Sequence, residues 1–225
     1  MTSTALISLV EQHYTAHQDE QRASEMSAYM RNLFPFLGIH RPKRDELNKI
    51  IFSLVKSEMS KTSLEETALL LFQKQEREYH YFALDLLFKN INLLDESSLN
   101  TIEQLASQHS WWDSIDFIAT KIVSKLLTKN LLLWERMDEL SVHENLWLRR
   151  IAIICQIPFK KKTDEKRLFQ YCLANSEDKD FFIRKAIGWA LRSYSKSNPL
   201  AVREFVEKYE TIFSNLTKKE ALRRI

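Results

Sequence analysis

The chain has 225 residues, of which 44% are hydrophobic and 28% are charged, and its net charge is +3. This length allows one sizeable core or an array of small units, and this composition excludes global disorder. Only two glycines and four prolines are present. Sheets joined by tight turns normally use more glycine than that, so helices joined by short polar turns are expected.

Helical periodicity runs nearly throughout the chain. No linker or low-complexity segment divides it, so residues 1–225 are predicted to form a single domain. Polar, glycine or proline turn signals separate the expected helices, and they lie at 36–42, 92–98, 107–110, 141–145, 157–164, 175–180 and 197–199.

The first segment, MTSTALISLVEQHYTAH, lacks the basic start and the apolar run of a signal peptide. No window reaches the roughly 18 consecutive apolar residues of a membrane span. We therefore expect a cytoplasmic protein without a membrane partner. The two cysteines, Cys155 and Cys172, lie in apolar helical patterns, and both are predicted to be buried and reduced.

Four helical segments with aromatic residues at their start form an internal repeat. They are YFALDLLF from Tyr81, WDSIDFIA from Trp112, WLRRIAII from Trp147 and FIRKAIGW from Phe182, spaced by 31, 35 and 35 residues. Each interval has room for two helices of about 12 residues and their turns. The sequence therefore predicts an all-α fold, an α-solenoid of HEAT-like repeats with roughly six helix pairs and a curved, concave surface.

Solenoids of this kind mostly bind macromolecules, and the charge distribution indicates which kind. Residues 1–142 contain 15 Lys and Arg against 20 Asp and Glu, whereas residues 143–225 contain 18 against 10. The basic C-terminal part favours a polyanionic partner, although a merely solvated basic surface explains it equally well.

The segment SWWDSIDF has two adjacent tryptophans and two aspartates. With Ser110 as the N-cap of a helix, Asp113 occupies the reciprocal position of a capping box, which assigns it a structural role. An apolar core stripe is predicted for Trp111, Ile115, Ile118 and Ile122.

Trp112 and Asp116 are i and i+4, so they share a helical face away from this stripe. Asp116 is too far along the helix to cap it. One explanation is a tryptophan covering a repeat boundary beside a solvated aspartate. The other is a site for a cation, which the indole face and the carboxylate would both attract.

Two later helices repeat this pattern of polar or aromatic residues beside a core stripe. Arg149 and Arg150 lie off the stripe of their helix, and Trp189 lies off the centre of its own, near Lys185 and Arg192. Gly188 stands inside this helix at a cost of about 1 kcal/mol relative to alanine. A close ligand or a closely packed neighbouring helix would explain that glycine equally well.

Several kinds of chemistry have no support in the sequence. The six histidines form no H-E-x-x-H motif and no cluster with cysteine, so no metal site is expected. Motifs of nucleotide-binding loops and serine hydrolases are absent too. We expect a protein without a cofactor.

The chain resembles the AlkD-like DNA alkylation repair glycosylases, a bacterial family of HEAT-like repeat enzymes, over nearly its full length. Five blocks in order carry the resemblance, and the chain then ends in LTKKEALRRI. They are YMRNLFPFLGI (29–39), REYHYFALDLL (77–87), SWWDSIDFIA (110–119), NLWLRRIAI (145–153) and FFIRKAIGWALRSYSKSNP (181–199).

The resemblance implies a DNA glycosylase that removes positively charged N3- and N7-alkylated purines, such as 3-methyladenine and 7-methylguanine, from duplex DNA without flipping the base. It places Trp112, Asp116 and Trp189 around the lesion, and it gives Tyr29 and Arg150 to the DNA-facing cleft and its backbone contacts. For phosphate contacts we expect basic residues of the C-terminal half, namely Arg149, Arg150, Lys185, Arg192, Lys160, Lys161 and Lys162. The protein is expected to act as a monomer in the bacterial cytoplasm, at the nucleoid.

The chain departs from the family pattern at two positions. His40, which is expected to contribute to DNA binding, stands where well-studied members have glutamine, and Pro158 stands where a DNA-facing lysine is expected. These departures concern backbone contacts, not Asp116. Two alternatives remain open, since some relatives bind branched DNA without excision and a solenoid can also serve as a protein scaffold.

Overall fold

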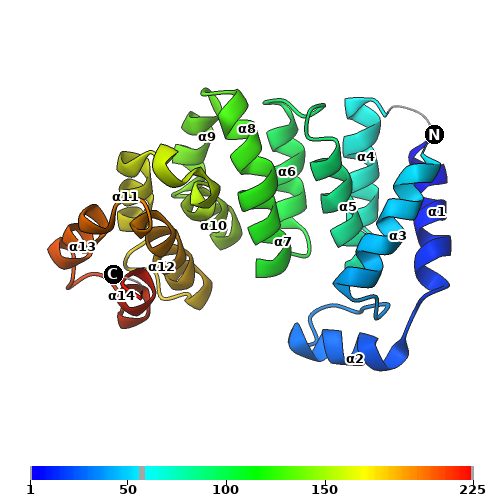
Figure 1. Ribbon diagram of the computed structural model, residues 1–225, viewed down its shortest axis with the longest axis horizontal. Coiled ribbons are helices and arrows are strands. Elements are labelled where there is room, and N and C mark those ends of the chain that lie inside the picture. Colours follow the sequence, from blue (N-terminus) through cyan, green and yellow to red (C-terminus); the bar gives the residue numbers. More distant parts are fainter. Residues whose placement is uncertain (1, 56–58, 224–225) are drawn as a thin grey trace. The chain divides into compact units, whose positions relative to one another are not determined.

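A computed structural model describes residues 2–55 and 59–223 of the chain, and within these ranges the secondary structure is helical and includes no strand (Figure 1). The all-α prediction is confirmed, and the succession of short packed helices is that of an α-solenoid of helical repeats. The chain divides into two compact units, residues 1–101 and residues 102–225.

The first unit contains five helices among the described residues and the start of a sixth. They are α1 (Ser3–Thr15), α2 (Glu20–Tyr29), α3 (Arg41–Leu54), α4 (Lys61–Phe72), α5 (Arg77–Lys89) and α6 (Ser98–Ser107), the last of which contains the boundary between the units. α1 packs against α3 and α4, and α4 packs along α5. In α1 the buried residues Leu6, Val10 and Tyr14 recur every four positions, which forms the apolar stripe that this packing needs.

A buried carboxylate fixes the long connection between α2 and α3. Glu78 of α5 is fully buried and accepts hydrogen bonds from the backbone N–H groups of Leu37, Gly38 and Ile39 at 2.9–3.0 Å. Gly38 has φ +85°, and a Cβ there would come within 2.1 Å of the Asp19 carbonyl oxygen. The turn predicted at 36–42 therefore needs glycine for its conformation and for its close contact with the start of α2.

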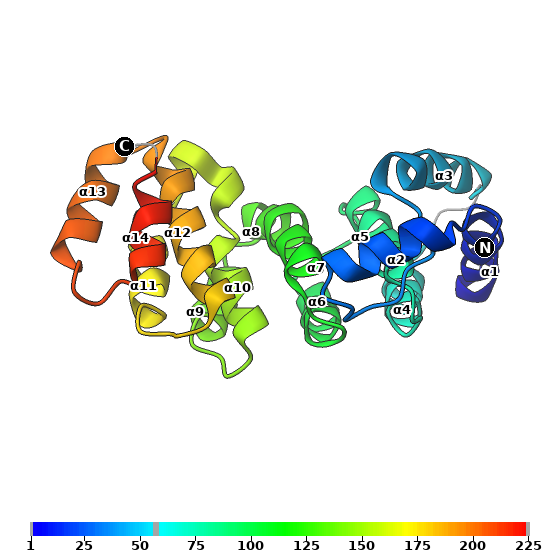
Figure 2. The ribbon, with the colours of Figure 1, turned by 90° about the horizontal axis from the view of Figure 1, so that it is seen from below.

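The second unit holds the rest of the repeat. Its helices after α6 are α7 (Trp112–Phe117), the π-helical segment η1 (Ile118–Val123), α8 (Ser124–Lys129), α9 (Leu133–Leu140), α10 (Leu146–Ile154), the 3₁₀ segment η2 (Ile157–Lys162), α11 (Glu165–Ala174), α12 (Phe181–Ser195), α13 (Pro199–Lys208) and α14 (Asn215–Ala221). α10 packs against α7, α9 and α12, and α12 packs against α13 and α14 (Figure 2). Cys155 and Cys172 are free and buried, as predicted.

Each segment of the predicted aromatic repeat lies in a helix, and other helices separate these four helices along the chain. α5, α7, α10 and α12 contain Tyr81, Trp112, Trp147 and Phe182. In α7, α10 and α12 the aromatic residue lies within the first two positions, whereas Tyr81 is the fifth residue of α5. The repeat register is therefore regular in the second unit and shifted in the first.

Each predicted turn coincides with a break between α-helices, since 157–164 contains the short 3₁₀ segment η2. Besides the break between α3 and α4, which includes residues outside the described ranges, the sequence did not predict the breaks at 16–19, 73–76, 130–132 and 209–214. None of these segments contains glycine or proline. Polar side chains define two of these boundaries, since Asp19 and Ser214 each accept a hydrogen bond from the first turn of the helix that follows. At predicted turns, the side chains of Asn145, Asp164 and Asp180 cap the following helix in the same way.

Helix packing explains the glycine inside α12. A Cβ on Gly188 would lie 2.4 Å from Cβ of Glu220 and 3.1 Å from the Thr217 carbonyl oxygen, both on α14. Of the two explanations that the sequence left open, the structure supports the closely packed helix.

Candidate active site

An ion pair between α7 and α10 is the centre of the candidate site. The carboxylate of Asp116 accepts two hydrogen bonds from Arg150, from Nε to Oδ1 at 2.7 Å and from Nη2 to Oδ2 at 2.9 Å. The Arg150 side chain is 6% exposed and that of Asp116 is 19% exposed. This fork-to-fork geometry fixes the plane of the carboxylate.

The same guanidinium also binds the third helix of the site. Arg150 Nη1 donates to the backbone carbonyl of Phe182 on α12 at 2.6 Å. Seven residues later on α12, and therefore on the same helical face, lies the half-buried Trp189. Arg150 thus connects the helix of Asp116 with the helix of Trp189, and Trp112 lies one turn before Asp116 on α7.

The electrostatics of Asp116 reflect two opposing effects. Burial raises the pKa of the Asp116 carboxyl, and the nearby charge of Asp113 raises it further. The hydrogen bonds and the positive charge of Arg150 act in the other direction without cancelling the shift. A buried carboxylate with a perturbed pKa and a specific charge partner is typical of a functional site.

The predicted start of α7 is wrong. The backbone at Trp111 is extended and the helix begins at Trp112, while the Ser110 hydroxyl donates back to the Ala106 carbonyl at 2.6 Å. Ser110 is therefore not the N-cap. Asp113 is the second residue of the helix, still in the first turn near the positive end of the helix dipole.

The prediction that Trp111 belongs to the core stripe is also wrong. Its ring is only partly buried and forms a cluster with Trp147 at 5.7 Å and Phe182 at 4.8 Å between centroids. The extended backbone at Trp111 removes its side chain from the helical face that Ile115, Ile118 and Ile122 occupy, and these three are fully buried as predicted. The aromatic cluster lies beside the Arg150 contact, because Phe182 contributes both its ring and its carbonyl.

A second pair of tryptophan and aspartate with the same i, i+4 spacing has a structural role. Trp134 and Asp138 of α9 are again i and i+4, and Arg167 pairs with Asp138 at 3.1 Å while its guanidinium lies 5.3 Å from the centre of the Trp134 ring. Trp134 is buried, and Tyr171 also donates to Asp138 at 2.5 Å. The sequence reasoning did not single out this pair, in which the chain's own arginine fills the cation position.

Other basic residues expected at phosphates already hold partners within the second unit. Arg149 pairs with Asp178 at 2.7 Å and donates to the carbonyls of His143 and Glu144. Lys185 and Arg192 both pair with Glu220, at 2.8 and 3.1 Å.

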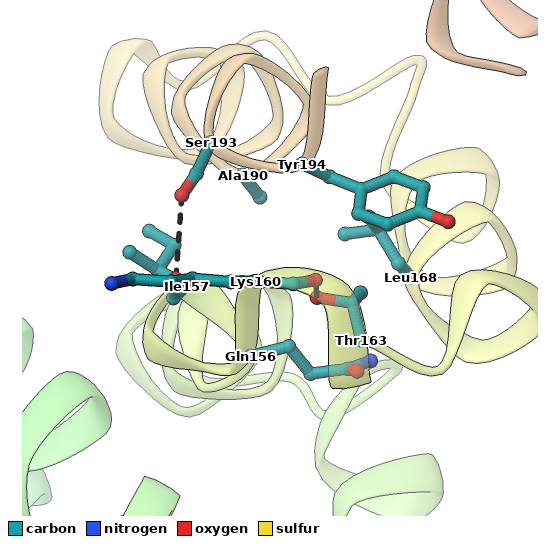
Figure 3. A pocket seen from close by; sticks show the side chains of 8 residues that line it. All are labelled: Gln156, Ile157, Lys160, Thr163, Leu168, Ala190, Ser193 and Tyr194. Atoms are coloured by element: carbon teal, nitrogen blue, oxygen red, sulfur yellow. Dashed lines mark hydrogen bonds between the residues drawn. The ribbon is translucent and has the colours of Figure 1, made fainter. Parts of the chain in front are cut away.

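Lys160, Lys161 and Lys162 are exposed on η2. Two hydrogen bonds connect the residues on either side of this segment. The side-chain amide of Gln156 donates to the Asp164 carbonyl at 3.2 Å and accepts from the Asp164 backbone N–H at 2.7 Å. Beside this segment, a shallow recess lies between η2 and α12, where Ser193 donates to the Ile157 carbonyl (Figure 3). It has no room for a water molecule, so it is no substrate pocket.

Two expected DNA-binding residues belong to the first unit. Tyr29 is the last residue of α2 and is 72% exposed. His40 is the exposed N-cap residue of α3. Within the described residues no group of three or more His, Cys, Asp or Glu side chains could hold a metal ion. None of the described helices is long and apolar enough to cross a membrane.

The structure defines the class of this protein as an α-helical repeat protein in which an arginine binds a carboxylate between helices, with aromatic residues beside it. Comparison with known proteins gives its family. The family of DNA alkylation repair enzymes matches residues 10–225, and the chain belongs to it. It is similar to a solved structure described as a predicted DNA alkylation repair enzyme from Enterococcus faecalis. The identity is 32%, the match covers 92% of this chain and 96% of the other, and the TM-score is 0.85. Among curated proteins, none matches the chain.

Proposed function

We propose that the protein is a DNA glycosylase that excises N3- and N7-alkylated purines, such as 3-methyladenine and 7-methylguanine, from duplex DNA. The observation that carries this proposal is the largely buried Asp116 carboxylate, which Arg150 holds in a fixed plane one helical turn from Trp112. Membership of the DNA alkylation repair family supports a role in DNA repair.

The chemistry of the lesion suits a single carboxylate. An N3- or N7-alkylated purine is positively charged, so when the glycosidic bond breaks its electron pair neutralises the departing base. The positive charge passes to the sugar as an oxocarbenium-like species, and water then adds at C1′ and loses a proton. A fixed anion beside the sugar stabilises this charge in the transition state more than in the ground state.

We assign separate roles to the residues around this step. Asp116 stabilises the developing sugar charge and orients the water, and Arg150 acts as a positioning residue for its carboxylate. Trp112 and Trp189 bind the cationic base and the electron-poor sugar through their ring faces. The reaction proceeds without a cofactor and without flipping of the base.

DNA binding in this proposal relies on basic and aromatic side chains outside the ion pair. The exposed lysines Lys160, Lys161 and Lys162 contact phosphates, and Tyr29 and His40 contribute contacts from the first unit. The two units act together as one functional domain, and the protein acts as a monomer on chromosomal DNA.

The test is incubation with methylated duplex DNA, followed by chromatography of the released bases. We expect the wild type to release 3-methyladenine or 7-methylguanine above the spontaneous rate and Asp116→Asn to lose about 10²–10³ in rate. Asp138→Asn is the matched control, since it alters the other Trp-x-x-x-Asp-Arg arrangement, and it should release bases like the wild type. Tight binding of DNA junctions without base release would instead support a structural binder of branched DNA.

A further inference from the structure

Two cations of α12 share one carboxylate of α14. Lys185 Nζ lies 2.8 Å from Oε1 of Glu220, and Arg192 Nη1 lies 3.1 Å from Oε2, so each carboxylate oxygen binds one cation. The Glu220 side chain is 13% exposed, whereas Lys185 and Arg192 are 36% and 22% exposed. The cations therefore remain accessible to solvent while their shared anion is largely buried.

The backbone holds Glu220 in this position independently of its charge. Lys185, Gly188 and Arg192 are i, i+3 and i+7 on α12 and lie on one face. Gly188, which has no Cβ, allows the close approach of Cβ of Glu220, and the Thr217 hydroxyl donates to the Arg184 carbonyl at 3.2 Å. Packing of α14 thus places a carboxylate between two cations, next to the position of Trp189.

The charge balance at this point favours an anion. The hydrogen bond from Lys185 lowers the pKa of Glu220, and the charges of Lys185, Arg192 and Arg223 lower it further. Three positive side chains thus act on one carboxylate. A DNA phosphate has the same single negative charge and two free oxygens, so it can replace a carboxylate between a lysine and an arginine.

We propose that Lys185 and Arg192 form a binding site for a backbone phosphate of DNA, in which Glu220 is the resident anion that the phosphate displaces. This inference deepens the proposed function and rests on its DNA-binding part. DNA releases condensed cations in proportion to the phosphate charge that a protein neutralises. In the wild type the Glu220 carboxylate cancels part of the positive charge of Lys185 and Arg192, so this site neutralises less phosphate charge and releases fewer cations than it would without Glu220.

The first experiment compares Glu220→Gln with Glu103→Gln in binding to an undamaged DNA duplex. Glu103 is a matched control, because its side chain is 15% exposed and accepts two hydrogen bonds from Arg136, at 2.8 and 2.6 Å. Both variants raise the net charge by one. Between 50 and 200 mM salt, Glu220→Gln should lose roughly 3- to 12-fold more affinity than the wild type, the effect of one or two additional counterion-releasing contacts.

The control should keep the salt dependence of the wild type. Tighter binding by Glu220→Gln at 50 mM salt, together with its steeper slope, supports the proposal. Equal slopes for both variants overturn it.

The second experiment uses inorganic phosphate and does not depend on DNA binding or on excision. In isothermal titration, Glu220→Gln should bind phosphate more tightly than the wild type and Glu103→Gln, and adding Lys185→Gln should remove the gain. Equal phosphate binding by all variants overturns the inference even if the protein proves to be a glycosylase. If Glu220→Gln does not fold, Lys185→Gln alone decides, because it should weaken DNA binding, and unchanged affinity contradicts the proposal.

Discussion

Asp116 combines burial, a negative charge and a raised pKa in one side chain. Arg150 offsets part of the cost of burying that charge, but the pKa of Asp116 remains above its ordinary value, so the folded state holds the carboxyl proton more strongly than the unfolded chain does. Proteins commonly retain such local costs where activity requires them.

Replacing Asp116 by asparagine should abolish most excision, and at neutral pH it also leaves the buried Arg150 guanidinium without its charged partner. Because the pKa of Asp116 is raised in the folded state, its contribution to stability is present at low pH and is lost as the pH rises through that pKa. The wild type should therefore gain stability relative to Asp116→Asn as the solution is acidified. Thermal unfolding of both proteins at several pH values measures this, and an opposite trend would contradict the assigned direction.

Replacing Arg150 by glutamine should shift the pH dependence of excision. Excision needs the ionised carboxylate, so its acid limb should lie above the ordinary aspartate pKa of about 3.9. The variant loses the hydrogen bonds and the charge that oppose the shift, and its acid limb should move to still higher pH. Single-turnover rates against pH, corrected for spontaneous depurination, measure the change.

The free energy of unfolding provides a second measure of the effect of Arg150→Gln. Removal of Arg150 leaves a buried carboxylate without its partner, at a cost of about 3 kcal/mol. Arg167→Gln is the matched control, because its ion pair with Asp138 is about one-third exposed and contributes about 1 kcal/mol or less. An unchanged acid limb in Arg150→Gln would restrict Arg150 to a structural role.

At the scale of elements, α12 links the candidate site with the end of the described chain. Its first turn supplies the Phe182 carbonyl to Arg150, and its third turn packs on α14 at Gly188. The fold of the last helices therefore determines the position of the face that includes Trp189. Glycine is needed in α12 because of packing, against the local helix preference.

Gly188→Ala tests this balance by the sign of its effect. Alanine at an open helical position would stabilise the helix by about 1 kcal/mol relative to glycine. Here the added Cβ would meet Cβ of Glu220 at 2.4 Å, so we expect a net loss of about 1–3 kcal/mol from overpacking. Denaturant unfolding measures the change, and a stabilised variant would show that α14 moves aside without cost.

At the scale of the whole molecule, part of the basic excess of residues 143–225 is already paired with carboxylates of the same chain. Arg149, Lys185 and Arg192 hold carboxylate partners, whereas Lys160, Lys161 and Lys162 are exposed on one short segment. This distinction was not visible in the charge count, because a sequence does not show which charges neutralise one another.

Replacing Lys160, Lys161 and Lys162 together by glutamine should weaken binding to any duplex sequence and reduce its salt dependence. The slope of log affinity against log salt should fall by roughly 0.9 for each phosphate that the variant no longer neutralises. Fluorescence anisotropy at four salt concentrations measures the slope. Arg149→Gln, which removes a paired cation, should leave the slope nearly unchanged, and a larger effect of that control would contradict the assignment.

Much of the architecture could be predicted from the sequence alone. Apolar residues at helical spacing and the near absence of glycine determined the all-α fold, and the spacing of aromatic segments located α5, α7, α10 and α12. Ile115, Ile118 and Ile122 were assigned to the core correctly for the same reason. These features depend on local periodicity, which the order of residues contains directly.

Tertiary structure decided what depends on residues far apart in the chain. Trp111 left the core stripe because the helix begins one residue later than the serine signal indicated, and Arg150 became the partner of Asp116, 34 residues away. Gly188 and Glu220 met through packing of α14. Such contacts arise when separate helices pack, and side chains of opposite charge then pair because burial removes the water that would otherwise solvate them.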